Sequence, residues 1–160
     1  SFKIEGRNRP PEYVALIVRE YRKTIDNKLS KEEINKSIEN LKKVYNRGFS
    51  SGFYIKMPTS DDLSYSEHGE QTEKKIYIGR IEKYWPKAKV AGIRMHHGTL
   101  KKGNEIYLIG KETGAKRIKV ERIEMKNKEI DSCKKGDFIG IKIPNAKKND
   151  EVYLIEKKTI

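Results

Sequence analysis

The sequence is poor in cysteine, in long hydrophobic runs and in acidic side chains, and each shortage excludes a class of protein. The one cysteine, Cys133, excludes an intramolecular disulfide framework and a cysteine-only metal cluster within these 160 residues, and it favours a reducing, cytoplasmic location. No apolar run approaches the roughly 18 residues that a transmembrane helix needs, so we expect no membrane partner. The 23 Asp and Glu against 36 Lys and Arg give a net charge of +13, which favours a polyanionic partner such as RNA.

Familiar catalytic motifs are also missing. The sequence has no phosphate-binding loop of the Walker type, no Gly-x-Ser-x-Gly elbow and no His-Glu-x-x-His run. A self-contained nucleotide hydrolase, serine hydrolase or zinc protease is therefore disfavoured. The length suits one ordinary domain, or a small barrel with a helical appendage. Because the chain starts at Ser1-Phe2 without Met, we expect it to be a piece of a longer protein.

The N-terminal third predicts a short strand and two amphipathic helices. Residues 2–5 alternate apolar and charged side chains, which is typical of a strand. Two prolines then open a helix that should run over 11–26 with an apolar stripe. Ser30 followed by Glu33 forms a capping box at the start of a second helix, whose apolar side reaches Tyr45.

The rest of the chain predicts a polar linker and a small all-β domain. Residues 58–75 are polar and acidic without sustained periodicity. From residue 76 on, six β-rich runs are separated by turns that contain Gly, Asn or Asp, and they cover 76–84, 89–95, 105–109, 117–125, 138–143 and 151–155. This spacing favours a closed β-barrel of about six strands, and the fold class is α+β.

Four ordered segments of this β region resemble domain 2 of elongation factor Tu and related translation factors. They are residues 78–82, 89–93, 100–106 and 134–141. The N-terminal third resembles peptidase family U32, the collagenase-like peptidases, through residues 3–7, 11–14 and 45–54. This second resemblance implies that residues 1–57 are the last strand and helices of an upstream catalytic (β/α)-barrel, followed by the linker 58–75 and the barrel domain 76–160.

The family resemblance also implies an activity and a partner. Members are described as peptidases or collagenases, and several bacterial members are implicated in hydroxylating bases of tRNA or rRNA. The cysteine-containing signature of the family lies upstream of the matched region, where an iron or iron–sulfur site could sit. We therefore expect no cofactor in residues 1–160, an upstream catalytic domain of the same chain as a partner, an enzymatic full-length protein and no turnover by this chain alone.

Lys3, Glu5 and Arg7 are the candidate catalytic residues, as contributors to a site completed upstream. If the resemblance holds, their strand belongs to a (β/α)-barrel, in which residues at the carboxyl ends of strands line the active site. The alternative is that Lys3 and Glu5 pair on a solvated surface.

Two groups of residues are candidates for binding RNA. Arg47, Phe49, Phe53 and Tyr54 combine a cation with aromatic rings that stack on bases, although the same segment could end a helix and pack against the upstream barrel. In the β region the candidates for phosphate contacts are Arg94, Lys101, Lys102, Arg117, Lys134 and Lys135, with Tyr84, Trp85 and Tyr107 available for stacking. The alternative is that lysines at turns and strand edges prevent edge-to-edge aggregation.

Three functions follow from these patterns. The first is an accessory region that orients a macromolecular substrate, tRNA or rRNA, for an upstream catalytic domain. The second is part of a protease that acts on a polypeptide or collagen-like substrate. The third is a structural barrel for domain packing or oligomerisation.

Overall fold

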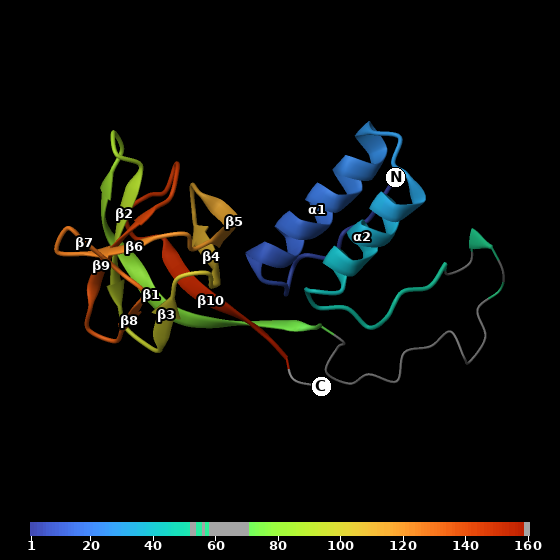
Figure 1. Cartoon of the computed structure of the whole chain (residues 1–160). Coiled ribbons are helices and arrows are strands. Elements are labelled where there is room, and N and C mark those ends of the chain that lie inside the picture. The colour runs from blue at the N-terminus through green and yellow to red at the C-terminus, as the bar shows by residue number, and fades with distance from the viewer. Residues whose placement is uncertain (52–53, 56, 58–70, 159–160) are drawn as a thin grey trace. The chain divides into compact units, whose positions relative to one another are not determined.

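The computed structural model describes residues 1–51, 54–55, 57 and 71–158. They divide into two compact units, Ser1–Glu73 with Lys157–Ile160 and Lys74–Glu156, and we call them the helical unit and the strand unit (Figure 1). Most of the predicted linker, and Phe53, lie outside the described residues. The first strand begins at Glu73, three residues before its predicted start.

The two predicted helices are present in the helical unit. Helix α1 spans Pro11–Asp26 and has Pro in its first turn, where a missing backbone donor costs nothing. Helix α2 spans Lys31–Leu41 and begins with the predicted capping box: Ser30 Oγ accepts a hydrogen bond from the Glu33 backbone N–H at 3.3 Å, and Glu33 Oε2 accepts one from the Ser30 N–H at 2.9 Å. The helix ends at Leu41, four residues before Tyr45, which was predicted to be the last residue of its apolar side.

The apolar stripes of both helices are only partly covered. On α1 the buried side chains are Leu16 and two glutamates, whereas Val18, Tyr21 and Ile25 of the predicted stripe are 40–50% exposed. Ile34 and Ile38 on α2 are exposed to a similar degree. The helical unit thus leaves a large part of its apolar surface open to solvent.

The predicted leading strand over residues 2–5 is wrong for this structure. Residues 1–6 have no strand assignment, because no described segment pairs with their backbone groups. The Phe2 ring instead packs edge-to-face on Tyr21, with 5.2 Å between ring centroids.

The strand unit holds ten strands. They are β1 (Glu73–Trp85), β2 (Val90–Met95), β3 (Thr99–Lys101), β4 (Glu105–Gly110), β5 (Gly114–Lys119), β6 (Ile123–Met125), β7 (Lys128–Ile130), β8 (Ser132–Lys134), β9 (Phe138–Lys142) and β10 (Glu151–Lys157). Eight of them form one sheet in the order β5-β4-β10-β1-β2-β9-β6-β7, and β3 pairs with β8 in a separate two-stranded sheet. The α+β class is confirmed.

The prediction of a closed barrel of about six strands is wrong in its count and in its closure. Strands β3, β6, β7 and β8 have three residues each, too few for a visible alternation of apolar and polar side chains. The predicted run 117–125 is divided between β5 and β6 around the fully buried Val120. Within the described residues, the end strands β5 and β7 do not pair with each other, and β3 and β8 form a separate ladder, so the ring of hydrogen bonds is open.

One continuous core nevertheless fills the strand unit. Its fully buried side chains include Ile78 and Ile93, and Cys133 belongs to the same cluster. The repeated turns behave as the sequence indicates, since Gly103, Gly136 and Asn149 have φ of 89°, 93° and 73°. Neither described helix is long and apolar enough to cross a membrane.

Candidate functional site

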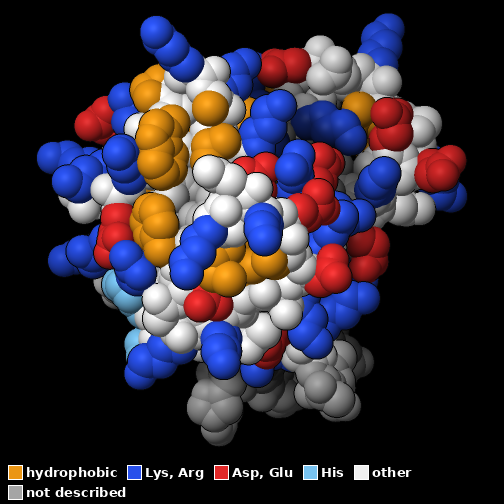
Figure 2. Space-filling view, turned by 60° about the vertical axis from the view of Figure 1, so that its left-hand side comes forward, with side chains coloured by type: hydrophobic (Ala, Val, Ile, Leu, Met, Phe, Trp, Pro, Cys, Tyr) orange, Lys and Arg blue, Asp and Glu red, His pale blue; other side chains and the backbone are white. Residues whose placement is uncertain are grey.

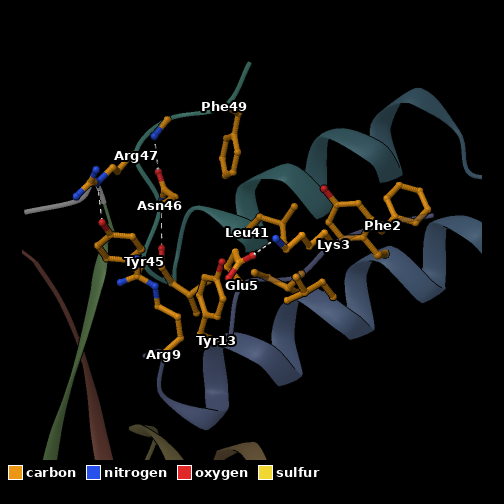
Figure 3. Close-up of a pocket in the computed structure, with 15 residues that line it drawn as sticks. Phe2, Lys3, Glu5, Arg9, Tyr13, Leu41, Tyr45, Asn46, Arg47 and Phe49 are labelled. Atoms are coloured by element: carbon orange, nitrogen blue, oxygen red, sulfur yellow. Dashed lines mark hydrogen bonds and ion pairs between the residues drawn. The ribbon is translucent and has the colours of Figure 1, made fainter. Parts of the chain in front are cut away.

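A cavity of about 540 Å³ in the helical unit brings two groups of predicted site residues together (Figure 3). Lys3 and Glu5 come from the N-terminal segment, and Arg47 and Phe49 come from the segment after α2. These positions are more than 40 residues apart in the sequence. Only folding of the two segments against the helices makes them neighbours.

Two of the three candidate catalytic residues, Lys3 and Glu5, line this cavity. Lys3 Nζ lies 2.9 Å from Glu5 Oε1, and both side chains are largely exposed. This is the solvated ion pair that the sequence offered as the alternative to a catalytic role. Arg7 is exposed and does not line the cavity.

The same cavity contains a tyrosine between two arginines. The Arg9 guanidinium carbon lies 3.5 Å from the centroid of the Tyr45 ring, and Arg47 Nε donates a hydrogen bond of 2.7 Å to the Tyr45 hydroxyl oxygen. Burial raises the pKa of Tyr45, but hydrogen bonds and charge from Arg9 and Arg47 outweigh it, so the pKa falls below the ordinary value for tyrosine. Of these three residues, only Arg47 was a candidate from the sequence.

The other aromatic candidates of the segment do not join this cavity. Tyr54 is 94% exposed and is not among the lining residues. Phe53 lies outside the described residues.

A second candidate site is a groove of about 880 Å³ on the outer face of the strand unit. Gly92 of β2 is paired with Gly140 of β9, and the outward side of this pair carries no side chain. Trp85 and Phe138 fill the space, since a Cβ atom on Gly92 would lie only 2.6 Å from Phe138 Cζ and 2.9 Å from Trp85 Cζ3. Two aromatic rings therefore lie on bare sheet backbone, which gives the groove an aromatic floor.

Trp85 faces outward because β1 contains an irregularity. The pairing of β1 with β2 shifts between Ile81 and Lys83, so that one additional residue is accommodated in β1. Ile81 is buried in the core and Tyr84 packs against it, which leaves Trp85 on the opposite face. A regular strand would have pointed Trp85 to the same side as Ile81.

Positively charged side chains border the aromatic groove. Lys83 Nζ lies 5.0 Å from the Trp85 ring centroid, and the Arg94 guanidinium carbon lies 4.9 Å from that of Phe138. Lys87 and Lys126 line the groove and make no ion pair with any described residue. Figure 2 shows several hydrophobic side chains grouped on one face, with many Lys and Arg and some Asp and Glu side chains around them.

The two acidic side chains that line the groove, Glu124 and Asp137, interact with other residues. Glu124 lies 3.0 Å from Arg122 Nε, and Asp137 Oδ2 accepts a hydrogen bond of 2.8 Å from the Lys134 backbone N–H. Neither carboxylate forms an ion pair with Lys87 or Lys126. The groove presents aromatic surface with an excess of positive charge.

The predicted phosphate-binding residues fall into two classes. Three of them pair with glutamates: Arg94 with Glu82 at 3.3 Å, Lys102 with Glu129 at 2.8 Å, and Arg117 with Glu105. Lys101, Lys134 and Lys135 are exposed and make no ion pair within the described part of the chain. Lys101 and Lys134 lie on the β3–β8 ladder, and the turn after Lys134 contributes Gly136 and Asp137 to the groove.

The structure offers no metal site and no reactive thiol among the described residues. No three His, Cys, Asp or Glu side chains gather closely enough there to hold a metal ion, so these residues do not fit an iron or iron–sulfur centre. Burial raises the pKa of the Cys133 thiol to about 11, and the thiol donates a hydrogen bond of 3.7 Å to the Leu100 carbonyl oxygen. The thiol is therefore protonated at neutral pH and is a poor nucleophile.

Sequence reasoning missed the residues that give both sites their shape. Arg9 and Tyr45 had no signal beyond their residue types, because their contact joins distant segments. Gly92 and Gly140 did carry one, since a glycine inside a strand marks a place where another group approaches the backbone closely.

Comparison with known proteins identifies two regions of the chain. Residues 1–64 match peptidase family U32, and residues 88–154 match elongation factor Tu domain 2. The two matched regions lie on either side of the boundary between the helical and strand units.

Four curated relatives match the chain, and three of them come from three different organisms. A protein named uncharacterized protease from Methanocaldococcus jannaschii is 36% identical over 100% of this chain and 40% of its own length. A collagenase of Porphyromonas gingivalis is 33% identical over 98% of this chain and 39% of its own length. A tRNA hydroxylation protein of Bacillus subtilis is 31% identical over 70% of this chain and 27% of its own length.

This chain thus spans about two fifths of the length of the first two relatives, at 40% and 39%. Residues 1–64 match the U32 family, and the alignments with the protease and the collagenase extend through the strand unit. The chain belongs to peptidase family U32 and carries a region similar to elongation factor Tu domain 2.

Proposed function

We propose that this chain is the C-terminal, substrate-binding region of a longer U32 protein, and that it orients an RNA substrate for an upstream catalytic domain. The observation that carries the proposal is the aromatic groove of the strand unit, with Trp85 and Phe138 on its floor and Lys87 and Lys126 at its border. The name of the B. subtilis relative, a tRNA hydroxylation protein, agrees with RNA as the substrate.

The groove has the chemistry that binds exposed nucleotides. Each base stacked on an aromatic side chain contributes about 1–3 kcal/mol, and stacking tolerates any base. Lysines at the border contact phosphates as point charges, and such contacts position the RNA without reading its sequence. The groove would therefore hold unpaired nucleotides of a structured RNA, and specificity would come from the shape of that RNA.

The helical unit supplies the proposed contact with the upstream domain. Val18 and Ile25 on α1 are 41% and 50% exposed, which is unusual for large apolar side chains on one small unit. A catalytic domain of the same protein would cover them, since the relatives are more than twice as long as this chain. Catalysis would then require residues outside this chain, and we expect no turnover by the chain alone.

The experiment is a fluorescence-anisotropy titration of the chain with tRNA and an rRNA fragment at two salt concentrations. Heparin and denatured collagen serve as competing ligands. Trp85→Ala should weaken RNA binding by roughly fivefold to a hundredfold, the loss of one stacked base. Trp85→Phe keeps an aromatic ring and should retain most of the affinity.

The charge contribution is tested separately. Replacing both Lys87 and Lys126 by Gln should make the plot of log affinity against log salt shallower by about 1.4, the value for two contacts to single-stranded phosphates. Lys111→Gln, an exposed lysine outside the groove, is the matched control. Equal binding of heparin and RNA, together with no effect of Trp85→Ala, would refute RNA recognition by the groove.

A polypeptide substrate is the second candidate. It is favoured by the names of the two relatives that match 98–100% of the chain, a protease and a collagenase. Stronger binding of denatured collagen than of RNA, lost in Trp85→Ala, would support it. In the full-length protein, Glu5→Gln should then abolish peptide cleavage. Binding of neither ligand would leave domain packing as the role of the strand unit.

A further inference from the structure

The cavity of the helical unit contains two positive charges that nothing in its lining neutralises. Its lining includes three cations, Lys3, Arg9 and Arg47, and one carboxylate, Glu5. Glu5 is paired with Lys3 at 2.9 Å. Neither arginine forms an ion pair with any residue that the structure describes, so within the described residues the two guanidinium groups have no counter-charge.

The two arginines are held in place by Tyr45. The Arg9 guanidinium carbon lies over the ring, 3.5 Å from its centroid, and Arg47 donates its Nε–H to the hydroxyl oxygen (Figure 3). A guanidinium group has five N–H donors, and these contacts leave several of them free. Because arginine stays protonated at any physiological pH, both charges persist.

The turn that carries Arg47 is also fixed. Asn46 Oδ1 accepts a hydrogen bond of 3.1 Å from the Gly48 N–H, and Asn46 Nδ2 donates to the carbonyl oxygens of Lys42 and Val44 at 3.2 and 3.0 Å. Gly48 has φ of 83°, which a side chain would disfavour. The side chain of Arg47 is therefore presented from a defined backbone rather than from a loose tail.

Aromatic and aliphatic side chains form the other walls of the cavity. Phe2, Tyr13 and Phe49 line it together with Tyr45. Its volume of about 540 Å³ falls in the usual range for small-molecule sites, about 300–1,000 Å³. Paired guanidinium groups suit the several oxygens of a phosphate, and aromatic walls suit a flat ring.

We infer that this cavity binds a nucleoside monophosphate unit, with the phosphate at Arg9 and Arg47 and the base against the aromatic walls. The Lys3–Glu5 pair supplies a donor and an acceptor for the polar edge of the base. The inference stands apart from the groove of the strand unit, because it concerns a different unit and other residues. It applies equally to a free nucleotide and to one presented by an RNA chain.

Calorimetric titration of the chain with AMP, GMP, CMP and UMP tests it. We expect saturable binding of at least one of them, at least tenfold tighter than that of the matching nucleoside, of inorganic phosphate and of benzoate. Arg9→Gln and Arg47→Gln should each weaken this binding at least tenfold. Arg22→Gln, an exposed arginine on α1 outside the cavity that pairs with Asp26, should leave it unchanged.

Tyr45 provides a second, spectroscopic measurement. A bound phosphate adds negative charge beside the phenol, so the phenolate absorbance at high pH, taken as the difference from Tyr45→Phe, should move to higher pH when the nucleotide is bound. A purely structural role of the arginines would not produce this shift.

Three outcomes would overturn the inference. They are no saturable binding of any of the four nucleotides, equal binding of benzoate, and equal affinities of the Arg9, Arg47 and Arg22 variants. If circular dichroism shows that Arg9→Gln does not fold, Arg47→Lys tests the inference instead. This variant keeps the positive charge but loses the planar guanidinium group, so it should still weaken nucleotide binding. Trp85→Ala should not affect nucleotide binding, so failure here and failure of RNA binding by the groove are separate results.

Discussion

Replacing Gly92 by Ala should displace the aromatic floor of the groove while leaving the strand unit folded. The new methyl group would lie 2.6 Å from Phe138 Cζ and 2.9 Å from Trp85 Cζ3, whereas ordinary contacts between carbons are 3.4–4 Å. Each ring must therefore move by roughly 1 Å, which is enough to lose its contact with the sheet. Gly92 does not have a positive φ, so the substitution adds no backbone strain.

The cost in stability should be modest. Overpacking a well-filled site costs about 1–3 kcal/mol, but Trp85 is 37% exposed and can swing outward. Replacing Gly by Ala also restricts the unfolded chain, which offsets about 0.4–1 kcal/mol. We expect a net loss of about 1 kcal/mol in the free energy of unfolding.

The effect on RNA binding should be larger than the effect on stability. Loss of one stacked base corresponds to a drop in affinity of roughly fivefold to a hundredfold. Trp85 is the only tryptophan of the chain, so its fluorescence reports directly on the groove. We expect a red-shifted emission in Gly92→Ala, measured together with urea unfolding and RNA anisotropy.

Gly140→Ala is the matched comparison on the partner strand. Its methyl group would meet Val90 Cγ1 at 3.3 Å and Glu124 Cβ at 3.9 Å, and would touch neither aromatic ring closely. Its effects on emission and affinity should be clearly smaller than those of Gly92→Ala. Unchanged emission and unchanged RNA affinity in Gly92→Ala would refute the assignment of the groove.

Three further predictions concern stability. Gly79→Ala should destabilise the strand unit by about 3 kcal/mol in urea unfolding, because its Cβ would run into the backbone carbonyl of Arg94, and a loss below 1 kcal/mol would contradict this. Ser30→Ala should cost the helical unit about 1 kcal/mol through loss of the capping box with Glu33, measured by thermal unfolding, and an unchanged melting temperature would be inconsistent with it. The pKa of Cys133, about 11 in the folded state, lies above the unfolded value of about 8.5, so its contribution to stability is complete below pH 8.5 and is lost as the pH rises towards 11. Cys133→Ala should lack this fall in unfolding free energy between pH 8 and 10.5, and parallel curves for the two proteins would disprove the effect.

Residue types alone predicted part of the cavity in the helical unit. Lys3, Glu5, Arg47 and Phe49 were chosen from the sequence, and the structure places all four around one cavity. Their proposed roles stay predictions. The residue that organises the cavity, Tyr45, could not be chosen, since its contacts with Arg9 and Arg47 depend on how the N-terminal segment folds back on the helices.

The sequence by itself determined the local elements of this protein. Two prolines start α1, and the capping box starts α2, because both signals act within one helical turn. The turns with positive φ at Gly103, Gly136 and Asn149 are likewise local, since they depend on the backbone freedom of single residues. The resemblance carried by a few short segments was sufficient to indicate peptidase family U32.

Only the tertiary structure decided the pairing of the strands and the faces of their side chains. Closure of the sheet depends on which strands find partners, and β3 and β8 pair with each other over three residues that show no pattern in the sequence. The register shift in β1 decides that Tyr84 points to the core and Trp85 to the groove, because one additional residue reverses the alternation of a strand. Pairing and register are set by contacts between distant segments, and local propensity does not contain that information.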